Sequence, residues 1–408
     1  MPPSPVLPRH PPPPAGRGSH RRGEGETALW SRRRLLGGLA ALPAAPLAVA
    51  TAACGLSVVT PSRPARAAGQ APLNIFAWSG YFSPALLNAF SEKTGINPVV
   101  HEYGSGAEML YHLRAGIIPF DVIMPQADWI PSLLALGLIQ PLDERRLNWD
   151  ALARAFLNEN ASRTSLITGR RYLFPLVWGS EGVAFDTTLA AIKGATLSYA
   201  DLWRPEHKGR VALRPASAFM GLGLWLESQN RLPRPLWEAF GNETALRADF
   251  EVIFRLALDL RRWTGQVWRD DASAQEAFRT DGCIVGQVWD ATAAELKREK
   301  LPIRYTVPKE GGLAWLEGFA IPRTLSNREA AYQWINAFTA PEFCTLLASQ
   351  TGLGVTLRQG ERLLGESQRL FHQEAYPGDA LDRLWWWPPQ NDRFLALQNE
   401  YLERLQHG

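Results

Sequence analysis

The sequence predicts an α/β fold with two lobes, and three observations support this prediction. The chain has 408 residues, which is enough for two packed lobes of about 100–200 residues each and a leader. Its 46% hydrophobic and 20% charged residues are typical of a globular protein and exclude a wholly disordered chain. From residue 73 onward, short apolar runs alternate with amphipathic segments, as in strand–helix–strand units.

The first 68 residues have the composition of a leader. Residues 1–28 are rich in Pro, Arg and Gly without apolar periodicity, and we expect them to be disordered. The paired arginines Arg32 and Arg33 precede a long Ala/Leu/Val stretch, which is typical of a signal peptide for the twin-arginine export route. Pro43 and Pro46 make this stretch a poor permanent transmembrane helix, so an uncleaved anchor is the less favoured alternative.

Two processing sites are open in the leader. The small-x-small sequence Ala65-Arg66-Ala67 fits a cleavage site and is slightly favoured, because cleavage there would release a soluble protein. Cys54, which follows Thr51-Ala52-Ala53, could instead carry a lipid that anchors the protein. In both cases we expect a periplasmic protein that works outside the cytoplasmic membrane.

The charge of the body differs from that of the leader. The leader holds nine Arg residues and two acids, Glu24 and Glu26, which leaves 34 basic and 38 acidic residues, or a net charge of −4, for residues 69–408. An acidic body argues against nucleic acid as a partner and suits a cationic ligand.

No metal, cofactor or catalytic motif is predicted. The sequence contains no C-x-x-C pair or Cys/His cluster, so no metal site is expected. A disulfide between Cys283 and Cys344 is chemically permitted outside the cytoplasm, but two separately buried thiols are favoured. The sequence also lacks a G-x-S-x-G elbow, an H-E-x-x-H motif, a phosphate loop and a dinucleotide fingerprint, so an enzyme is not expected.

The first half of the body reads as three strand–helix units. Strands are predicted at residues 73–78, 97–103 and 121–124, and helices at 83–94, 107–114 and 128–136. Ser83 is expected to cap the first helix, while Gly95 and Gly137 end the first and third helices. Such units imply a parallel sheet with helices on both faces.

The second half continues the pattern with longer elements. Strands are predicted at residues 172–185, 210–213, 283–289, 303–307 and 315–321, with a long helix at 247–264 and mainly helices toward the end. The run Trp385-Trp386-Trp387 is expected to pack the last helix against its lobe, with a permease-docking patch as the alternative.

Aromatic and polar side chains gather where these strands end. Ligands of open α/β sheets bind beyond the carboxyl ends of the strands, so these side chains could line one cleft. The tryptophans that could do so are Trp78, Trp178, Trp289 and Trp315. The candidate ligand-binding residues are Trp78, Tyr81, Gln126, Glu181, Trp289, Asp290 and Glu317.

Each candidate has a structural alternative. The tryptophans can be core residues and Tyr81 an ordinary loop tyrosine. Glu181 and Asp290 can be helix caps or ion-pair partners, and Glu317 can be a hinge carboxylate. Asp128 is expected to cap the helix that follows it rather than to contact a ligand.

Seven blocks, in order along the body, resemble spermidine/putrescine-binding proteins. They are Phe76-Ala-Trp-Ser-Gly-Tyr81, Phe90-Ser-Glu-Lys-Thr-Gly-Ile96, Phe120-Asp-Val-Ile-Met-Pro125, Asp201-Leu-Trp-Arg-Pro-Glu-His-Lys-Gly209, Gly286-Gln-Val-Trp-Asp290, Val307-Pro-Lys-Glu-Gly-Gly312 and Ala320-Ile-Pro322. Through this resemblance, Trp78 and Tyr81 match the family's first-lobe aromatic wall, Trp289 an aromatic near a crossover, and Glu317 an aspartate that binds an ammonium.

The resemblance implies the type II periplasmic-binding-protein fold, in which two α/β lobes enclose a ligand cleft. It implies a first lobe of residues 73–177 and about 290–325, and a second lobe of residues 178–289 and about 326–408. The crossings between the lobes are expected near Trp178 and near residues 289–290. The implied function is that of a monomeric solute-binding component, without a cofactor, that delivers a polyamine to the permease subunits of an ABC importer.

The sequence also departs from the spermidine-type pattern. Pro215, Ala216 and Phe219 stand where some polyamine binders carry acids, and Gly80 replaces a larger residue. A tyrosine that the family often has near residues 350–353 is missing. The alternatives therefore include a different small amine, a zwitterionic solute, and a sensor that presents its ligand to a receptor.

Such residues suit a polyamine for physical reasons. Burying an ammonium group requires compensating partners, which carboxylates supply through charge-assisted hydrogen bonds. Aromatic faces cover the methylene chain and attract the cation, at about 0.5–2 kcal/mol for each contact. Closure of the lobes would exclude water and form the state that a permease recognises.

Overall fold

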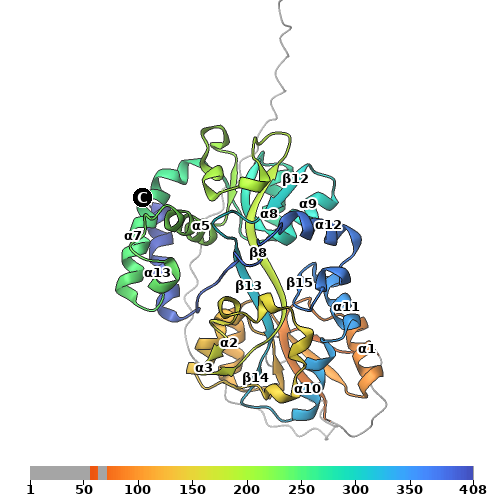
Figure 1. Cartoon of the computed structure of the whole chain (residues 1–408). Coiled ribbons are helices and arrows are strands. Elements are labelled where there is room, and N and C mark those ends of the chain that lie inside the picture. Colours follow the sequence, from red (N-terminus) through yellow and green to blue (C-terminus); the bar gives the residue numbers. More distant parts are fainter. Residues whose placement is uncertain (1–55, 63–70, 408) are drawn as a thin grey trace, which may run out of the picture. The chain divides into compact units, whose positions relative to one another are not determined.

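The computed structural model describes residues 56–62 and 71–407. The predicted leader features, including Arg32, Arg33, Cys54 and the cleavage site at residues 65–67, lie outside these residues. Within the described ranges, none of the helices has the length and apolar character needed to cross a membrane. The described residues belong to one compact unit, which contains two lobes that are each built around a sheet (Figure 1).

The first lobe contains a four-stranded sheet. Its strands lie in the order β1 (Val58–Val59), β3 (Pro98–Tyr103), β2 (Leu73–Trp78) and β4 (Val122–Ile123). Strand β2 is parallel to both β3 and β4, as the strand–helix pattern predicted. Two short strand pairs lie outside this sheet. They are β5 (Ile139–Gln140) with β14 (Ile321–Pro322), and β6 (Leu166–Ile167) with β7 (Arg170–Arg171).

The helices of the first lobe come from two separate parts of the chain. They are α1 (Pro84–Thr94), α2 (Gly106–Ala115), α3 (Ile130–Ala135), α4 (Glu159–Ser162), α10 (Arg328–Ala337) and α11 (Pro341–Thr351). Aromatic contacts join the two parts, because Phe90 of α1 packs on Trp334 of α10 with ring centroids 4.8 Å apart. Trp334 in turn packs on Phe338 at 5.1 Å.

The second lobe contains a mixed sheet rather than a purely parallel one. The main order is β10 (Thr264–Val267), β9 (Val211–Leu213), β11 (Val285–Trp289), β8 (Phe174–Asp186), β13 (Leu313–Phe319) and β16 (Trp385–Trp386). Strands β12 (Ile303–Thr306) and β15 (Gly354–Val355) also pair with β8. Strands β9, β10 and β11 are parallel neighbours, whereas β8 is antiparallel to β11, β12, β13 and β15, which accounts for the mixed sheet.

The helices of the second lobe surround this sheet. They are α5 (Pro215–Ser228), α6 (Leu236–Ala239), α7 (Glu243–Leu260), α8 (Asp271–Arg279), α9 (Asp290–Arg298), α12 (Glu366–Ala375) and α13 (Asp392–His407). The core between α5, α7 and α13 is aromatic, since Phe250 lies 5.1 Å from Phe219 and 5.6 Å from Tyr401 between ring centroids. The C-terminal helix thus belongs to the second lobe.

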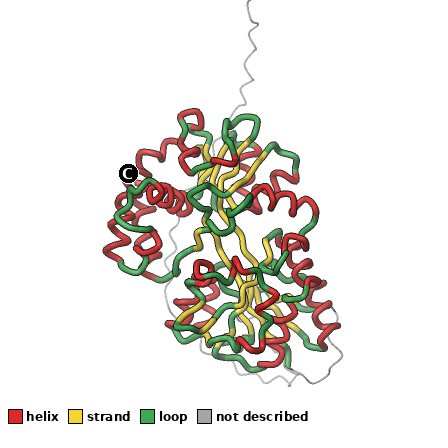
Figure 2. The backbone as a smooth tube through the Cα atoms, viewed as in Figure 1, coloured by secondary structure: helices red, strands yellow, loops and turns green. Residues whose placement is uncertain are grey.

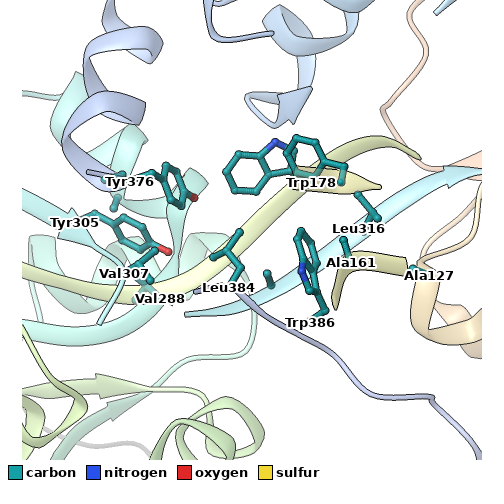
Figure 3. Packing of buried hydrophobic residues seen from close by; sticks show 14 of the residues in the cluster. Ala127, Ala161, Trp178, Val288, Tyr305, Val307, Leu316, Tyr376, Leu384 and Trp386 are labelled. Atoms are coloured by element: carbon teal, nitrogen blue, oxygen red, sulfur yellow. The ribbon is translucent and has the colours of Figure 1, made fainter. Parts of the chain in front are cut away.

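Two long strands, β8 and β13, connect the lobes (Figures 1 and 2). Phe174 and Val177 of β8 lie in the first-lobe core, and Val183 of the same strand lies in the second-lobe core. Strand β13 does the reverse, from Leu313 in the second-lobe core to Phe319 in the first-lobe core. Near the crossing, Trp178, Leu316 and Trp386 belong to one buried cluster (Figure 3).

This arrangement differs from the predicted lobe boundaries. The first crossing lies near Trp178, where it was expected, but the second lies at β13 and not at residues 289–290. Residues 290–306 belong to the second lobe, because β12 pairs with residues 183–186 of β8. Residues 328–351 belong to the first lobe, because α10 and α11 bury their apolar faces in its core. The long-range pairing of β8 decides both boundaries.

The two cysteines of the described residues lie in different cores. Cys283 and Cys344 are both buried free thiols, and they belong to separate clusters of buried residues. Burial raises the pKa of Cys283 to about 11 and that of Cys344 to about 12, so both thiols are protonated near neutral pH.

Candidate functional site

A cleft of about 760 Å³ is lined by both lobes and by the crossing strand β13. The first lobe contributes Trp78, Ser79, Gly80, Tyr81, Gln126, Asp128, Trp129, Thr351 and Leu353. Strand β13 contributes Trp315 and Glu317, and the second lobe contributes Arg214, Ala216, Asp271, Trp289, Ala291, Trp387, Gln390 and Gln398. Aromatic rings and charged groups are therefore combined in one concave site.

The first-lobe wall forms where parallel strands end. Trp78 is the last residue of β2, and its ring packs on that of Tyr103 with centroids 4.6 Å apart. The turn after Trp78 has a left-handed residue, Gly80 with φ of +80°, whose N–H donates to Oε1 of Glu102 at 2.8 Å. This turn leads the chain to Tyr81 at the cleft. The neighbouring strand β4 leads to Gln126 and Asp128 at the same sheet edge.

Glu317 is the most deeply buried acid of the cleft wall, with only 2% of its surface exposed. Its Oε1 accepts a hydrogen bond from Nε2 of Gln126 at 3.1 Å. Its Oε2 has no hydrogen-bond partner in the described part of the chain. Burial raises the pKa of Glu317 to about 7, although interactions with Tyr81 and Gln126 lower it in part. Tyr81 and Gln126 thus compensate the buried carboxylate only in part.

Asp128 is a second buried acid beside Glu317, with 7% of its surface exposed. Burial, with a smaller contribution from the nearby charge of Glu317, raises its pKa to about 8. Asp128 was expected to cap a helix, but Gln126 precedes the 3₁₀ turn Ala127–Trp129 and Trp129 precedes α3. The structure instead places Asp128 at the cleft. Two neighbouring carboxylates therefore favour a cation at this wall.

Aromatic rings link the two walls of the cleft. Trp289, at the end of β11, packs on Trp268 with centroids 4.9 Å apart and lies 6.4 Å from Trp315. Trp315 lies over Gly179 of β8, where a Cβ atom would come within 2.3 Å of the indole ring. A glycine is therefore required there for the indole to occupy its position at the cleft.

The second-lobe wall carries charged groups of both signs. Arg214 precedes α5, and its guanidinium carbon lies 5.4 Å from the ring centroids of Trp268 and Trp289. Asp271, the first residue of α8, is hydrogen-bonded at both oxygens, by the hydroxyl of Thr292 and by Nε2 of Gln275, each at 2.5 Å. Arg214 and Asp271 both line the cleft.

The structure brings five of the seven predicted residues to the cleft. These are Trp78, Tyr81, Gln126, Trp289 and Glu317. Glu181 is fully buried and does not line the cleft, because it pairs with Arg214 at 2.7 Å and accepts a hydrogen bond from Ser217 at 2.7 Å. Glu181 therefore supports the cleft wall through Arg214 and has no direct place in it.

Asp290 also lies outside the cleft lining. It is 5% exposed, and its Oδ2 accepts hydrogen bonds from the hydroxyl of Tyr376 at 2.6 Å and from the N–H of Ser180 at 3.2 Å. Burial raises its pKa to about 6, although these hydrogen bonds lower it in part. Asp290 thus fixes the start of α9 against β8 through neutral donors, and it is neither the N-cap residue of α9 nor a member of an ion pair among the described residues.

Three other residues depart from the sequence interpretation. Trp178 lies on a separate pocket with His372 and Tyr376, so it does not join the other three tryptophans. Trp387 lines the cleft. Trp385 and Trp387 pack against the cluster that contains Phe394 and Tyr401 of the last helix, whereas Trp386 is buried in a different cluster. No sequence signal identified Arg214, because its position depends on a partner 33 residues away along the chain.

A metal site is not evident in residues 56–62 and 71–407. No three His, Cys, Asp or Glu side chains in these ranges lie where they could hold a metal ion together. The charges that line the cleft are those of Asp128, Asp271, Glu317 and Arg214. They suit an organic ion with its own hydrogen-bonding groups.

Two α/β lobes, two connecting strands and a cleft between them define a two-lobed solute-binding protein. Residues 85–369 match the sequence model of the bacterial extracellular solute-binding protein family, and the chain belongs to this family. The predicted type II periplasmic-binding-protein fold is thereby confirmed.

Relatives with assigned names agree with the resemblance seen in the sequence. The chain is 24% identical to the spermidine/putrescine-binding periplasmic protein of Escherichia coli over 384 residues, which cover 93% of this chain and 99% of the relative. It is 25% identical to the putrescine-binding periplasmic protein PotF of Escherichia coli over 290 residues, which cover 68% of this chain and 75% of the relative. The predicted resemblance to the spermidine/putrescine-binding proteins is confirmed.

A solved structure has the same fold. The spermidine/putrescine ABC transporter substrate-binding protein PotD of Streptococcus pneumoniae superimposes with a TM-score of 0.69 at 20% identity. The match covers 83% of this chain and 99% of that chain.

Proposed function

We propose that this chain is the extracytoplasmic solute-binding component of an ABC importer and that it binds a small, polyamine-like organic cation in the cleft. The ligand's ammonium group binds at the first-lobe wall, and its methylene groups lie against the tryptophans. The relatives carry the names of binding proteins for spermidine and putrescine, which supports this ligand class.

The observation that carries the proposal is the pair of buried acids at the aromatic wall. Glu317 and Asp128 are 2% and 7% exposed, and Oε2 of Glu317 has no hydrogen-bond partner in the described residues. An ammonium group would supply the missing donors and the compensating charge. Trp78 and Tyr81 lie in the same wall, where their ring faces can cover the ligand.

The fold supplies a means of closing over a ligand. Strands β8 and β13 join the lobes, so a small rotation about them would bring the two walls together. A ligand that contacts both walls favours the closed form, because only that form makes all the contacts. We propose that the protein is a monomer and that its closed form delivers the ligand to the permease subunits in the membrane.

The export route and location are parts of the same proposal. Arg32 and Arg33 would direct the chain through the twin-arginine route, and the body would work in the periplasm. Cleavage at residues 65–67 would release it, whereas a lipid on Cys54 would anchor it. Mass spectrometry of the exported protein distinguishes these two forms.

Calorimetric titration of the purified protein tests the ligand class. Putrescine, cadaverine and spermidine are titrated at pH 8.5, with 1,4-butanediol as an uncharged compound of similar length. We expect binding of at least one amine with a Kd of about 1 µM or tighter, and no heat with the diol. The variant Glu317→Gln should lose most of this affinity, because the charge at the ammonium site is removed.

A matched variant controls for general effects of losing a carboxylate. Glu206 is exposed and does not line the cleft, so Glu206→Gln should bind like the wild type. The proposal is overturned if no ligand that carries an ammonium group binds, or if the diol binds as tightly as the amines.

A further inference from the structure

The second-lobe wall of the cleft differs in charge from the first-lobe wall. The side chain of Arg214 is 30% exposed and lines the same cleft as the buried acids Asp128, of the first lobe, and Glu317, of β13. A ligand with ammonium groups at both ends would place one of them beside this guanidinium. Coulomb repulsion would then oppose binding at that end.

Arg214 is held rigidly with part of its donor edge free. Its Nη2 donates to Oε2 of Glu181 at 2.7 Å, and its Nε donates to Oγ of Ser217 at 2.9 Å and to Oε1 of Glu181 at 3.3 Å. The rings of Trp268 and Trp289 lie 5.4 Å from the guanidinium carbon. No hydrogen bond from Nη1 is formed within the described part of the chain.

The start of α5 adds further donors at the same place. Arg214 occupies the N-cap position, and no side chain caps this helix of 14 residues. The first intrahelical bond runs from the N–H of Ala218 to the carbonyl of Arg214. Ala216, in the first turn, lines the cleft. Its backbone N–H has no intrahelical partner, so this N–H and the positive end of the helix dipole would act together with Arg214 on an anion.

We infer that Arg214 and the start of α5 form a carboxylate subsite, so that the cleft selects an ω-amino carboxylate over a diamine of the same length. This inference rests on the proposed function, because the amine end of the ligand is the cation bound at Asp128 and Glu317. The guanidinium would bind one carboxylate oxygen through Nη1, and the tryptophans would cover the methylenes between the two ends.

Asp271 provides the competing assignment for the second end of the ligand. It lies on the same wall and could attract a second ammonium group. Both of its oxygens already accept short hydrogen bonds, from Thr292 and Gln275, whereas Nη1 of Arg214 is free within the described residues. The structure therefore favours an anion over a second cation at this end, and variants of each residue separate the two assignments.

Calorimetric titration with three ligands tests the inference on the wild-type protein. Putrescine and 5-aminopentanoate each contain four methylene groups, and butylamine has the same amine end without a second charge. The comparison is repeated with shorter and longer diamines and ω-amino carboxylates. We expect an ω-amino carboxylate to bind at least about tenfold more tightly than the diamine with the same number of methylenes.

Variants assign the effect to Arg214. Arg214→Gln should weaken binding of the ω-amino carboxylate by at least about tenfold and should not weaken binding of the diamine, because the repulsion at that end is removed. Because Arg214→Gln leaves Glu181 buried without its partner, a double variant with Glu181→Gln removes both charges. It should show the same loss of preference for the ω-amino carboxylate over the diamine as Arg214→Gln. Thermal unfolding checks that the variants are folded, and Glu317→Gln should weaken both ligands equally through their shared amine end.

The outcomes separate this inference from the proposed function. The carboxylate subsite alone is overturned if a diamine binds as tightly as the ω-amino carboxylate of the same length. In that case the diamine should lose affinity in Asp271→Asn but not in the double variant. Failure of every amine-bearing ligand to bind overturns the proposed function and the subsite together.

Discussion

Two buried glutamates on neighbouring strands, Glu181 of β8 and Glu317 of β13, have opposite environments. Glu181 is fully buried and pairs with Arg214 and Ser217 through both of its carboxylate oxygens. Glu317 is 2% exposed and accepts one hydrogen bond from Gln126, while its other oxygen has no hydrogen-bond partner in the described residues. Both are strand residues of one sheet, yet only Glu317 lines the cleft.

The difference shows how a structural acid is distinguished from a binding acid. A buried carboxylate that has its own cation contributes to the fold, and removal of either partner leaves an uncompensated charge. A buried carboxylate without a cation weakens the fold and is stabilised when a ligand supplies the charge. Glu181 is the first kind and Glu317 the second, so the same substitution should affect stability at one site and ligand affinity at the other.

The largest expected effect is on folding, at Glu181. Glu181→Gln leaves the guanidinium of Arg214 without its charge partner, and the free energy of unfolding should fall by about 3 kcal/mol. This is the lower end of the range for buried pairs, because the Arg214 side chain is 30% exposed. Denaturant unfolding measures it, with Glu206→Gln as an exposed control. A loss below about 1 kcal/mol would contradict a structural role for the pair.

The second effect is on ligand affinity, at Glu317. At pH 8.5, Glu317→Gln should weaken the binding of the best amine by about 30-fold, or about 2 kcal/mol, because the ammonium loses a charge-assisted hydrogen bond in a buried site. Titration calorimetry of the two proteins gives the ratio. Equal affinities would mean that Glu317 does not contact the ammonium.

The third effect is the pH dependence of binding. The pKa values of Glu317 and Asp128 are raised to about 7 and about 8 in the empty cleft, so both acids hold protons at low pH. A cation binds their ionised forms, and its affinity should fall as the pH decreases from 8.5 to 6. The loss should be about tenfold if only Glu317 must lose its proton, and larger if Asp128, whose pKa is higher, must also ionise. Constant affinity over this range would show that neither acid contacts the cation.

The smallest effect is on the stability of the ligand-free protein. Burial raises the folded-state pKa of Glu317 from an ordinary 4.5 to about 7. The free energy of unfolding therefore falls as the pH rises from 4.5 to about 7, and the loss is fully present above that pH. Glu317→Gln removes this loss. The shift corresponds to about 3 kcal/mol at pH 8.5, part of which is offset because a neutral amide accepts a weaker hydrogen bond from Gln126. The net gain in the free energy of unfolding should be about 1 kcal/mol at pH 8.5 and close to zero at pH 4. Thermal unfolding at both pH values checks this, and a destabilised variant at pH 8.5 would refute it.

Elements with local signals could be predicted from the sequence. Helix α1 begins after Ser83, whose hydroxyl accepts a hydrogen bond from the N–H of Leu86, and it ends at Gly95 with φ of +74°. Strand β2 has the predicted bounds. Caps, glycines and hydrophobic periodicity all act within a few residues, so they are visible in the sequence.

Features that depend on distant partners could not be predicted. The lobe boundaries follow from the pairing of β8 with β12 and β13, more than 100 residues later in the chain. The places of Glu181 and Arg214 follow from their contact across 33 residues. Strand ends identified Trp78 and Glu317, but whether a side chain faces the cleft or the core depends on alternation along each strand and on its neighbours.

The central claim is that Glu317 and Asp128 hold protons in the empty cleft and give them up to a bound cation. Calorimetric titration at pH 7 in two buffers with different ionisation enthalpies counts the protons released for each ligand bound. We predict a release of roughly one proton from the wild-type protein and a clearly smaller release from Glu317→Gln. Binding of the amine without proton release, or with the same release from both proteins, would contradict the claim.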